Sequence, residues 1–264
     1  MFRPQKSLIA MVHVGPLPGT PAWRDNMTTL IRRATDEARL LSDEGADALM
    51  IENMYDRPYI TRVGPEVVAA MTAIGRAIRE MVRVPLGVQI LAAGNTEALA
   101  VASACEASFV RVEGFVYAQI ADEGLMPEAA AGQLLRYRRQ IGADDIALFA
   151  DIKKKHASHA ITNDVDLSET AKSAEFFGAD GLVVTGMGTG RPTAPEDVRT
   201  VRKSVDLPVL VGSGVTPDNL DSVWSDAEGF IVGSYFKHGG HWSNPPDPQR
   251  IRKLVAAVRQ RRDA

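Results

Sequence analysis

The sequence predicts an α/β fold, a single (β/α)8 TIM barrel with parallel strands over residues 1–264. Two observations favour this fold. Short apolar runs alternate with segments of helical periodicity, and eight such strand–helix units follow one another without a linker or a low-complexity stretch. The strands are apolar on both faces, which is typical of parallel sheets covered by helices. A doubly wound open sheet shows the same alternation and is the rival fold.

The elements can be placed in order along the chain. Strands are predicted where apolar runs end in polar residues, at residues 8–14, 48–52, 85–91, 109–113, 146–151, 181–185, 209–212 and 230–232. Helices are predicted between and after them, at residues 28–44, 65–81, 96–105, 127–140, 168–177, 194–203, 217–224 and 248–261. The first helix carries Leu30, Ala34 and Leu41 near helical spacing, and Asp247-Pro248 is typical of a helix start because proline fits the first turn.

Short entry motifs recur four units apart and favour the barrel over the open sheet. Gly45-Ala46-Asp47 precedes the second strand, and Gly178-Ala179-Asp180 precedes the sixth. Val84-Pro85 and Leu207-Pro208 introduce the third and seventh strands in the same way. Such spacing is what two half-barrels would show. A further copy, Gly142-Ala143-Asp144, precedes the fifth strand, so the repeat alone does not prove the fold.

Composition excludes several classes of protein. The chain has 30 Lys and Arg against 33 Asp and Glu, a formal net charge of −3, so we expect no nucleic-acid partner. The single cysteine, Cys105, excludes a disulfide framework and a cysteine-based metal cluster. No apolar run is long enough to span a membrane and none resembles a signal peptide. We therefore expect a soluble, cytoplasmic protein, and the helices offer faces for a homo-oligomer.

Polar residues gather where the predicted strands end, and in such barrels the active site is built there. The candidate catalytic residues are His13, Glu52, Glu113, Asp151, Lys155 and His156. Histidine and the carboxylates are typical of proton transfer, and lysine can act as acid, base or anion ligand.

Each of these candidates also has a structural interpretation. His13 can be a core histidine, Glu52 and Glu113 can pair with Arg111 or Lys153, and the triple lysine can be a solvated charge run. In an extended chain Asp151, Lys153 and Lys155 would share one side and point into the barrel mouth.

A metal site is an open alternative for the carboxylates. The sequence His13-Val14-Gly15 lacks a second histidine at metal-binding spacing and does not support zinc. Glu52, Glu113 or Asp151 could hold Mg²⁺.

Glycines after the last three strands predict a phosphate site. Glycine lets backbone N–H groups approach an anion, and barrels often hold phosphate after strands seven and eight. Tight turns are the alternative role for the same glycines, and Arg191 in the loop after the sixth strand could meet an anion. The candidate phosphate-binding residues are Gly186, Gly212, Ser213, Gly214, Gly233 and Ser234.

Two further groups of residues are predicted to be structural. The arginines of the last helix, among them Arg250 and Arg252, are expected to form a solvated face because the whole chain is acidic. His238, His241 and Trp242 are expected to cap the barrel mouth, with the lining of a pocket as the alternative.

Longer runs of the sequence resemble the BtpA/SgcQ family. The matching runs are residues 11–21 (MVHVGPLPGTP), 51–53 and 56–59 (IEN, DRPY), 63–66 and 69–72 (VGPE, AAMT), 150–156 (ADIKKKH), 180–190, 211–216 (VGSGVT), 233–237 (GSYFK) and 244–245 (NP). Pro246 stands where the family pattern would have a branched aliphatic residue. The resemblance implies a TIM barrel. The family is named for a factor in photosystem I biogenesis, and some bacterial relatives are associated with sugar-uptake operons.

Two functions from different classes follow. The first is an enzyme that acts on a small phosphorylated metabolite, a sugar phosphate or a nucleoside phosphate, by isomerase, lyase or hydrolase chemistry. The second is a non-enzymatic assembly or stability factor of the photosystem I biogenesis type. The density of polar residues at the strand ends favours the enzyme, because a scaffold does not need them.

Overall fold

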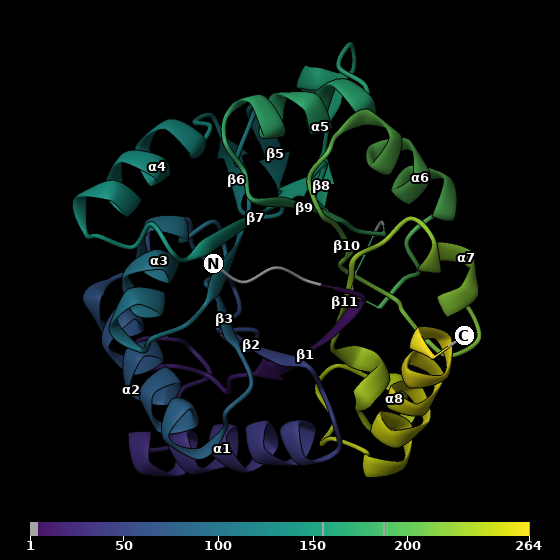
Figure 1. Cartoon of the computed structure of the whole chain (residues 1–264). Helices are drawn as coiled ribbons and strands as arrows, with labels where there is room; N and C mark the ends of the chain where they lie inside the picture. The colour runs from purple at the N-terminus through teal and green to yellow at the C-terminus, as the bar shows by residue number, and fades with distance from the viewer. Residues whose placement is uncertain (1–4, 155, 187, 189, 264) are drawn as a thin grey trace.

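Eight parallel strands close into a barrel at the centre of the molecule, and helices surround it (Figure 1). The computed structural model describes residues 5–154, 156–186, 188 and 190–263. Around the barrel the strand order is β1-β11-β10-β9-β7-β4-β3-β2. The strands are β1 (Ser7–His13), β2 (Ala48–Glu52), β3 (Leu86–Gln89), β4 (Phe109–Val112), β7 (Ala147–Ile152), β9 (Gly181–Val184), β10 (Val209–Val211) and β11 (Gly229–Val232). The predicted barrel is confirmed, and the open sheet is wrong because β1 pairs with β11.

The helices pack on the outside of the barrel with their apolar faces inward (Figure 1). Their bounds are α1 (Met27–Asp43), α2 (Pro65–Met81), α3 (Asn95–Ala104), α4 (Ala131–Gln140), α5 (Leu167–Phe176), α6 (Pro195–Ser204), α7 (Leu220–Trp224) and α8 (Pro248–Arg262). The Asp247 side chain caps α8 by accepting from the N–H of Gln249, at the helix start that proline predicts. No described helix is long and apolar enough to cross a membrane.

The interior of the barrel is filled by side chains, so it is a core and not a channel. Phe109 and Phe149 lie with their ring centroids 5.4 Å apart at its centre. A Cβ on Gly87 would lie 2.1 Å from the Phe109 ring, so only glycine leaves room for that ring. Ile9, Met11, Ala48, Met50, Phe109, Ala147, Phe149, Val183, Leu210 and Ile231 form this inner core.

Alternation along the strands continues this layer into the carboxyl end of the barrel. Met11 belongs to the inner core, and His13 lies two residues further along the same face. In the same way Met50 leads to Glu52 and Phe109 to Arg111. The polar residues at the strand ends therefore stand directly above an apolar floor.

The repeated entry motifs have equivalent roles in the two half-barrels. Asp47 accepts a hydrogen bond from the backbone N–H of Leu8 at 2.7 Å, and Asp180 accepts one from Leu148 at 2.9 Å. Each aspartate also pairs with an arginine from a helix, Arg262 in the first case and Arg138 in the second. These aspartates tie each strand to its neighbour at the amino end of the barrel, away from the site.

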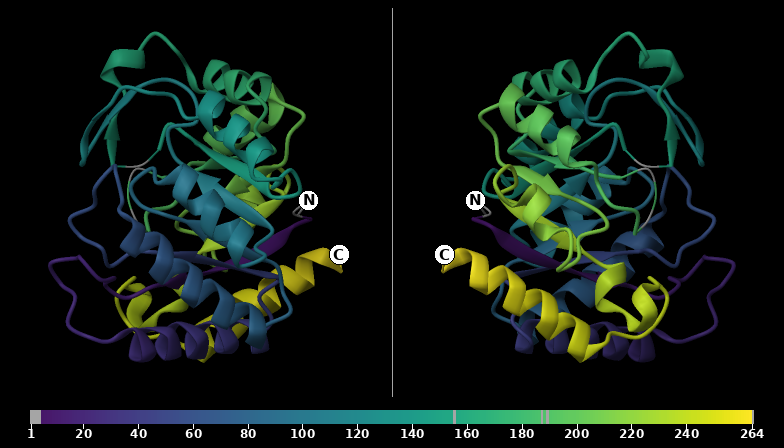
Figure 2. Two further views of the ribbon diagram at one scale, coloured as in Figure 1. Left: turned by 90° about the vertical axis from the view of Figure 1, so that its left-hand side faces the viewer. Right: turned by 90° about the vertical axis from the view of Figure 1, so that its right-hand side faces the viewer.

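A small antiparallel sheet is an addition that the sequence did not predict. It consists of β5 (Gln119–Ala121), β6 (Gly124–Met126) and β8 (Ala157–Ser158), in the order β6-β5-β8. Figure 2 shows it at the face of the barrel opposite the chain ends. Because the chain forms β6 and then a short connection, α4 begins at Ala131, and its predicted start at residue 127 is wrong.

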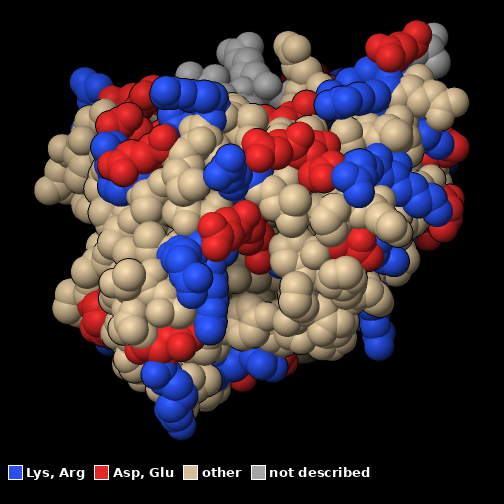
Figure 3. Space-filling view, turned by 90° about the horizontal axis from the view of Figure 1, so that it is seen from below, with Lys and Arg blue, Asp and Glu red and all other residues tan. Residues whose placement is uncertain are grey.

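Three short helical turns complete the connections, η1 (Ala160–Thr162), η2 (Ser234–Phe236) and η3 (His238–Gly240). Acidic and basic side chains are interspersed over the face seen in Figure 3. This mixture agrees with the small net charge.

Candidate functional site

A cavity of ≈ 130 Å³ lies at the carboxyl end of the barrel between β1, β2 and the loops after β10 and β11. We call it the inner cavity. It brings together many of the candidates that the sequence singles out, from both the catalytic and the phosphate-binding groups. These are His13, Glu52, Gly212, Ser213, Gly214, Gly233 and Ser234, and Arg111, Tyr235 and Arg250 line it with them.

His13 is held in a defined orientation at one end of the inner cavity. Its Nδ1 lies 3.1 Å from the backbone carbonyl oxygen of Trp242. A carbonyl only accepts hydrogen bonds, so Nδ1 carries the hydrogen and Nε2 of the neutral ring has the lone pair. Nε2 lies 4.0 Å from Oε2 of Glu52. This arrangement suits a general base whose charged form a neighbouring carboxylate stabilises.

The glycine after β11 makes room for this imidazole. A Cβ on Gly233 would lie 2.8 Å from Nε2 of His13 and 3.0 Å from Cε1. Gly233 therefore allows the histidine ring to lie against the backbone at the end of β11.

Asp151 and Arg111 form a buried pair just above the apolar floor of the barrel mouth. Nε and Nη2 of Arg111 donate to the two carboxylate oxygens at 2.8 and 3.1 Å, and the side chains are 3% and 1% exposed. Burial by itself lowers the pKa of Arg111, but the charge of Asp151, with Glu52 and Glu113 further away, raises it above its ordinary value. Arg111 thus has Asp151 as its structural partner, in place of the Glu52 or Glu113 that the sequence suggested as alternatives.

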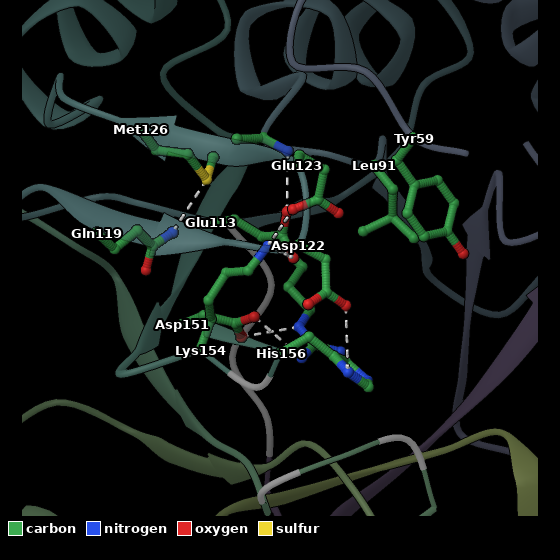
Figure 4. A network of polar contacts seen from close by, with 12 residues as sticks. Tyr59, Leu91, Glu113, Gln119, Asp122, Glu123, Met126, Asp151, Lys154 and His156 are labelled. Carbon is green, nitrogen blue, oxygen red and sulfur yellow. Dashed lines mark hydrogen bonds and ion pairs between the residues drawn. The ribbon is translucent and has the colours of Figure 1, made fainter. Parts of the chain in front are cut away.

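Glu113 lies in a second buried network, which Figure 4 shows. Its Oε2 accepts from the backbone N–H of Ala93 at 2.8 Å, and its Oε1 lies 3.4 Å from Nζ of Lys154. Lys154 also lies 3.6 Å from Glu123, in the turn between β5 and β6. Burial lowers the pKa of Lys154, but the two carboxylates together raise it above its ordinary value, so the amine stays charged. The lysine thus fastens the small sheet to the barrel.

The predicted alternation of the lysine run is wrong. Lys153 adopts a positive φ of 46°, so the chain after β7 is not extended. Lys153 donates to the carbonyl of Val165 at 2.6 Å. Lys155 lies outside the described residues. His156 is exposed, and its Nδ1 lies 3.7 Å from Asp122 (Figure 4).

The loop after β9 packs tightly against the loop after β10, and the candidate glycines Gly186 and Gly214 both lie at crowded positions beside Pro192. A Cβ on Gly214, which has a φ of +67°, would lie 2.4 Å from Cα of Pro192, and one on Gly186 would lie 2.5 Å from the Pro192 carbonyl oxygen. Ser213 Oγ accepts from the N–H of Gly186 at 2.7 Å and donates to the carbonyl of Arg191 at 3.0 Å. Ser213 and Gly214 therefore shape the wall of the inner cavity, whereas Gly186 supports that wall through its bond to Ser213 and is not among the lining residues.

Backbone N–H groups and one arginine also give the inner cavity an anion-binding character. None of the hydrogen bonds within the described part of the chain uses the N–H of Gly214, Ser234 or Tyr235. The Arg250 guanidinium stacks on the ring of Tyr235 at 4.3 Å and donates from Nε to the Tyr235 carbonyl at 2.6 Å. The expected solvated role of Arg250 is wrong, because this arginine lines the cavity.

The described residues include no group of three His, Cys, Asp or Glu side chains arranged to hold a metal ion. Glu113 is engaged by Lys154 and Ala93, and Asp151 by Arg111. These carboxylates therefore do not fit the Mg²⁺ site that the sequence left open.

Lys154 and Arg250 were not predicted as site residues, and two polar atoms at strand ends that the sequence does place at the mouth are buried. Oε1 of Gln89 and Oγ1 of Thr185 have no hydrogen-bond partner within the described part of the chain. The strand alternation marks both positions as part of the mouth. Nothing in the sequence distinguishes Arg250 from the other arginines of α8.

An outer cavity of ≈ 560 Å³ adjoins the inner one and shares Gly190, Ser234 and Gly240 with it. His156, Arg191, His241 and Trp242 line its outer part. The alternative prediction of a pocket role for His241 and Trp242 agrees with this placement.

Comparison with known proteins shows the family to which the chain belongs. The family model of BtpA matches residues 4–260. The chain belongs to the BtpA family. An uncharacterized mitochondrial protein of Caenorhabditis elegans is 43% identical over 95% of this chain and 92% of its own length. The photosystem I biogenesis protein BtpA of Synechocystis is 36% identical over 97% of this chain and 89% of its own length.

Solved structures with the same fold are much more distant in sequence from this BtpA-family chain. Thiamine phosphate pyrophosphorylase from Pyrococcus furiosus has a TM-score of 0.60 and 17% identity and covers 97% of this chain and 96% of its own. Orotidine 5′-monophosphate decarboxylase from Methanocaldococcus jannaschii has a TM-score of 0.60 and 15% identity, with 97% and 99% covered. At such identity the likeness shows the barrel fold.

Proposed function

We propose that the protein is an enzyme that acts on a small phosphorylated metabolite, a sugar phosphate or a nucleoside phosphate. The phosphate group would bind between the loops after β10 and β11, and the reacting carbon or oxygen would lie against His13 and Glu52. One observation carries this proposal: a single cavity is lined both by groups that can bind an anion and by His13 with Glu52. The fold neighbours named above have phosphorylated compounds in their titles, which supports a phosphorylated substrate.

The phosphate would be held by charge and by backbone donors. The N–H groups of Gly214, Ser234 and Tyr235 can donate to phosphate oxygens, and Arg250 supplies a positive charge. The ring of Tyr235 and its carbonyl fix the Arg250 guanidinium before a ligand arrives. A guanidinium fixed in this way loses little conformational entropy when it binds phosphate.

The chemistry would be proton transfer through Nε2 of His13. The Trp242 carbonyl keeps the hydrogen on Nδ1, so Nε2 can take a proton from the substrate, and Glu52 then stabilises the imidazolium. The buried Arg111 can stabilise negative charge that develops on the substrate, because its Nη1 lies outside the pair with Asp151. Isomerase, lyase and hydrolase reactions all use such a combination of a general base, a supporting carboxylate and a group that stabilises negative charge.

The direct experiment is a turnover screen. Purified protein is incubated with sugar phosphates and nucleoside phosphates in D2O, with and without Mg²⁺, and followed by ¹H and ³¹P NMR. We expect one compound to be converted or to exchange a carbon-bound proton. The variants His13→Gln and Glu52→Gln should slow that reaction by about 10²–10⁴-fold, the usual contribution of a general base.

The non-enzymatic alternative gives the opposite result. An assembly factor of the photosystem I biogenesis type, suggested by the name of the cyanobacterial relative, would convert none of the compounds. A reaction that His13→Gln leaves at the wild-type rate would refute the role of His13. The cytoplasmic location and the homo-oligomer stay predictions.

A further inference from the structure

The outer cavity has a lining whose charge the proposed phosphate site does not account for. Arg191 comes from the loop after β9, His156 from the loop after β7, and His241 from the loop after β11. None of the described residues that line this cavity is acidic. Three side chains that are cationic or can become so therefore face one space at the rim of the barrel.

Arg191 and His156 meet at Gly188. A Cβ on Gly188 would lie 3.6 Å from Cδ of Arg191, 3.8 Å from its Nε and 3.8 Å from Cε1 of His156. Within the described part of the chain, no acceptor pairs with the Arg191 guanidinium. The carboxylate of Asp122 lies 3.7 Å from Nδ1 of His156, and Asp122 is not among the residues that line the outer cavity.

The Trp242 ring at the outer cavity already packs against other side chains of the protein. Trp242 packs against Tyr55 with ring centroids 4.9 Å apart, and the Arg57 guanidinium lies 4.6 Å from the Trp242 ring. Since these groups occupy the ring, stacking of a planar ligand is disfavoured. Arg57 adds a further positive charge beside the cavity, which favours an anion.

The two cavities are contiguous. They share Gly190, Ser234 and Gly240, so a ligand with its phosphate in the inner cavity can extend past Ser234 into the outer one. A volume of ≈ 560 Å³ is within the range of small-molecule sites, which is about 300–1,000 Å³.

We propose that the outer cavity binds a second anionic group of the same substrate, held by Arg191 together with His156 and His241. The substrate would then be a bisphosphate or a phosphorylated carboxylic acid. This inference rests on the proposed phosphate site, because it assumes that the first phosphate binds in the inner cavity.

The test uses synthetic probes that span a range of lengths. Alkanediol bisphosphates with two to six carbons, the corresponding phosphorylated carboxylic acids and the matching monophosphates are titrated by calorimetry at constant ionic strength. We expect at least one bifunctional probe to bind about tenfold or more tightly than its monophosphate, the effect of a charge-assisted hydrogen bond. The better of the two series identifies the second group as phosphate or carboxylate.

Two variants test whether the outer cavity binds the second anionic group of the probe. Arg191→Gln and His241→Gln should remove the gain of the bifunctional probe and leave the affinity for the monophosphate unchanged. Arg136→Gln is the control for net charge, because the Arg136 side chain lies on α4 and, among the described residues, donates only to the Gly132 carbonyl. It should leave both affinities unchanged.

The outcomes separate the two proposals. If monophosphates bind and no bifunctional probe binds more tightly, the second anionic group is refuted while the phosphate site stands. Equal weakening of both classes of probe by Arg191→Gln would also refute it. If no monophosphate binds, the phosphate site itself fails, and the second group fails with it.

Discussion

Replacing Asp151 by asparagine tests whether this carboxylate is a structural partner of Arg111. The change keeps the size of the side chain but leaves a guanidinium without its counter-charge at a site where Arg111 is 3% exposed. Removing one member of a buried ion pair costs about 3–5 kcal/mol. Unfolding entropy is about 0.55 kcal/mol per kelvin for a chain of this length, so Tm should fall by about 5–9 °C.

The assay is thermal unfolding followed by circular dichroism, with a matched exposed pair as control. Asp144 and Arg139 form such a pair, with side chains 52% and 83% exposed. Asp144→Asn should change stability by less than about 1 kcal/mol, because exposed pairs contribute little. The double variant Arg111→Met with Asp151→Leu should recover much of the lost stability, since it leaves no buried charge. Equal Tm values for Asp151→Asn and Asp144→Asn would refute the reasoning.

Three further changes test other contacts of the site. Gly233→Ala should displace the His13 ring, because the new Cβ would lie 2.8 Å from Nε2. We expect the NMR resonances of the His13 ring to shift in this variant, and unchanged resonances would contradict the prediction. Ser213→Asp should abolish binding of inorganic phosphate in calorimetry while the barrel stays folded, since the added charge lies in the cavity wall; wild-type affinity would exclude the phosphate site. Lys154→Met should lower stability at neutral pH. Because the pKa of Lys154 is raised in the folded protein, its stabilisation is complete below the ordinary value of 10.5 and declines as pH rises through the folded pKa. In urea unfolding from pH 8 to 11, the difference in unfolding free energy between wild type and Lys154→Met should therefore shrink. A constant difference would argue against this role of the lysine charge.

The barrel and much of its mouth could be predicted because both depend on local patterns. A strand has a period of two, so the apolar residues that fill the barrel also fix which polar residue follows on the same face. His13 and Glu52 were identified in this way, and the structure places them side by side.

The errors have physical reasons that the local pattern does not contain. The positive φ of Lys153 ends the alternation after β7, so the buried lysine is Lys154. Arg250 reaches the cavity only because the loop after β11 brings Tyr235 beneath α8. The strands β5 and β8 are too short to show an alternation of apolar and polar residues. They form by pairing between segments that are distant in the sequence.

The central claim is that the inner cavity holds a phosphate group, and a thermal-shift comparison tests it most directly. Sugar phosphates and nucleoside phosphates are each compared with the same compound without phosphate. A ligand at 100 times its Kd adds about 2.7 kcal/mol, or about 5 °C in Tm for a chain of this length. We predict that only the phosphorylated compound of a pair shifts Tm. The shift should be lost in Arg250→Gln and kept in Arg252→Gln, whose side chain pairs with Glu44 on the surface. A shift that Arg250→Gln preserves, or no shift with any phosphorylated compound, would contradict it.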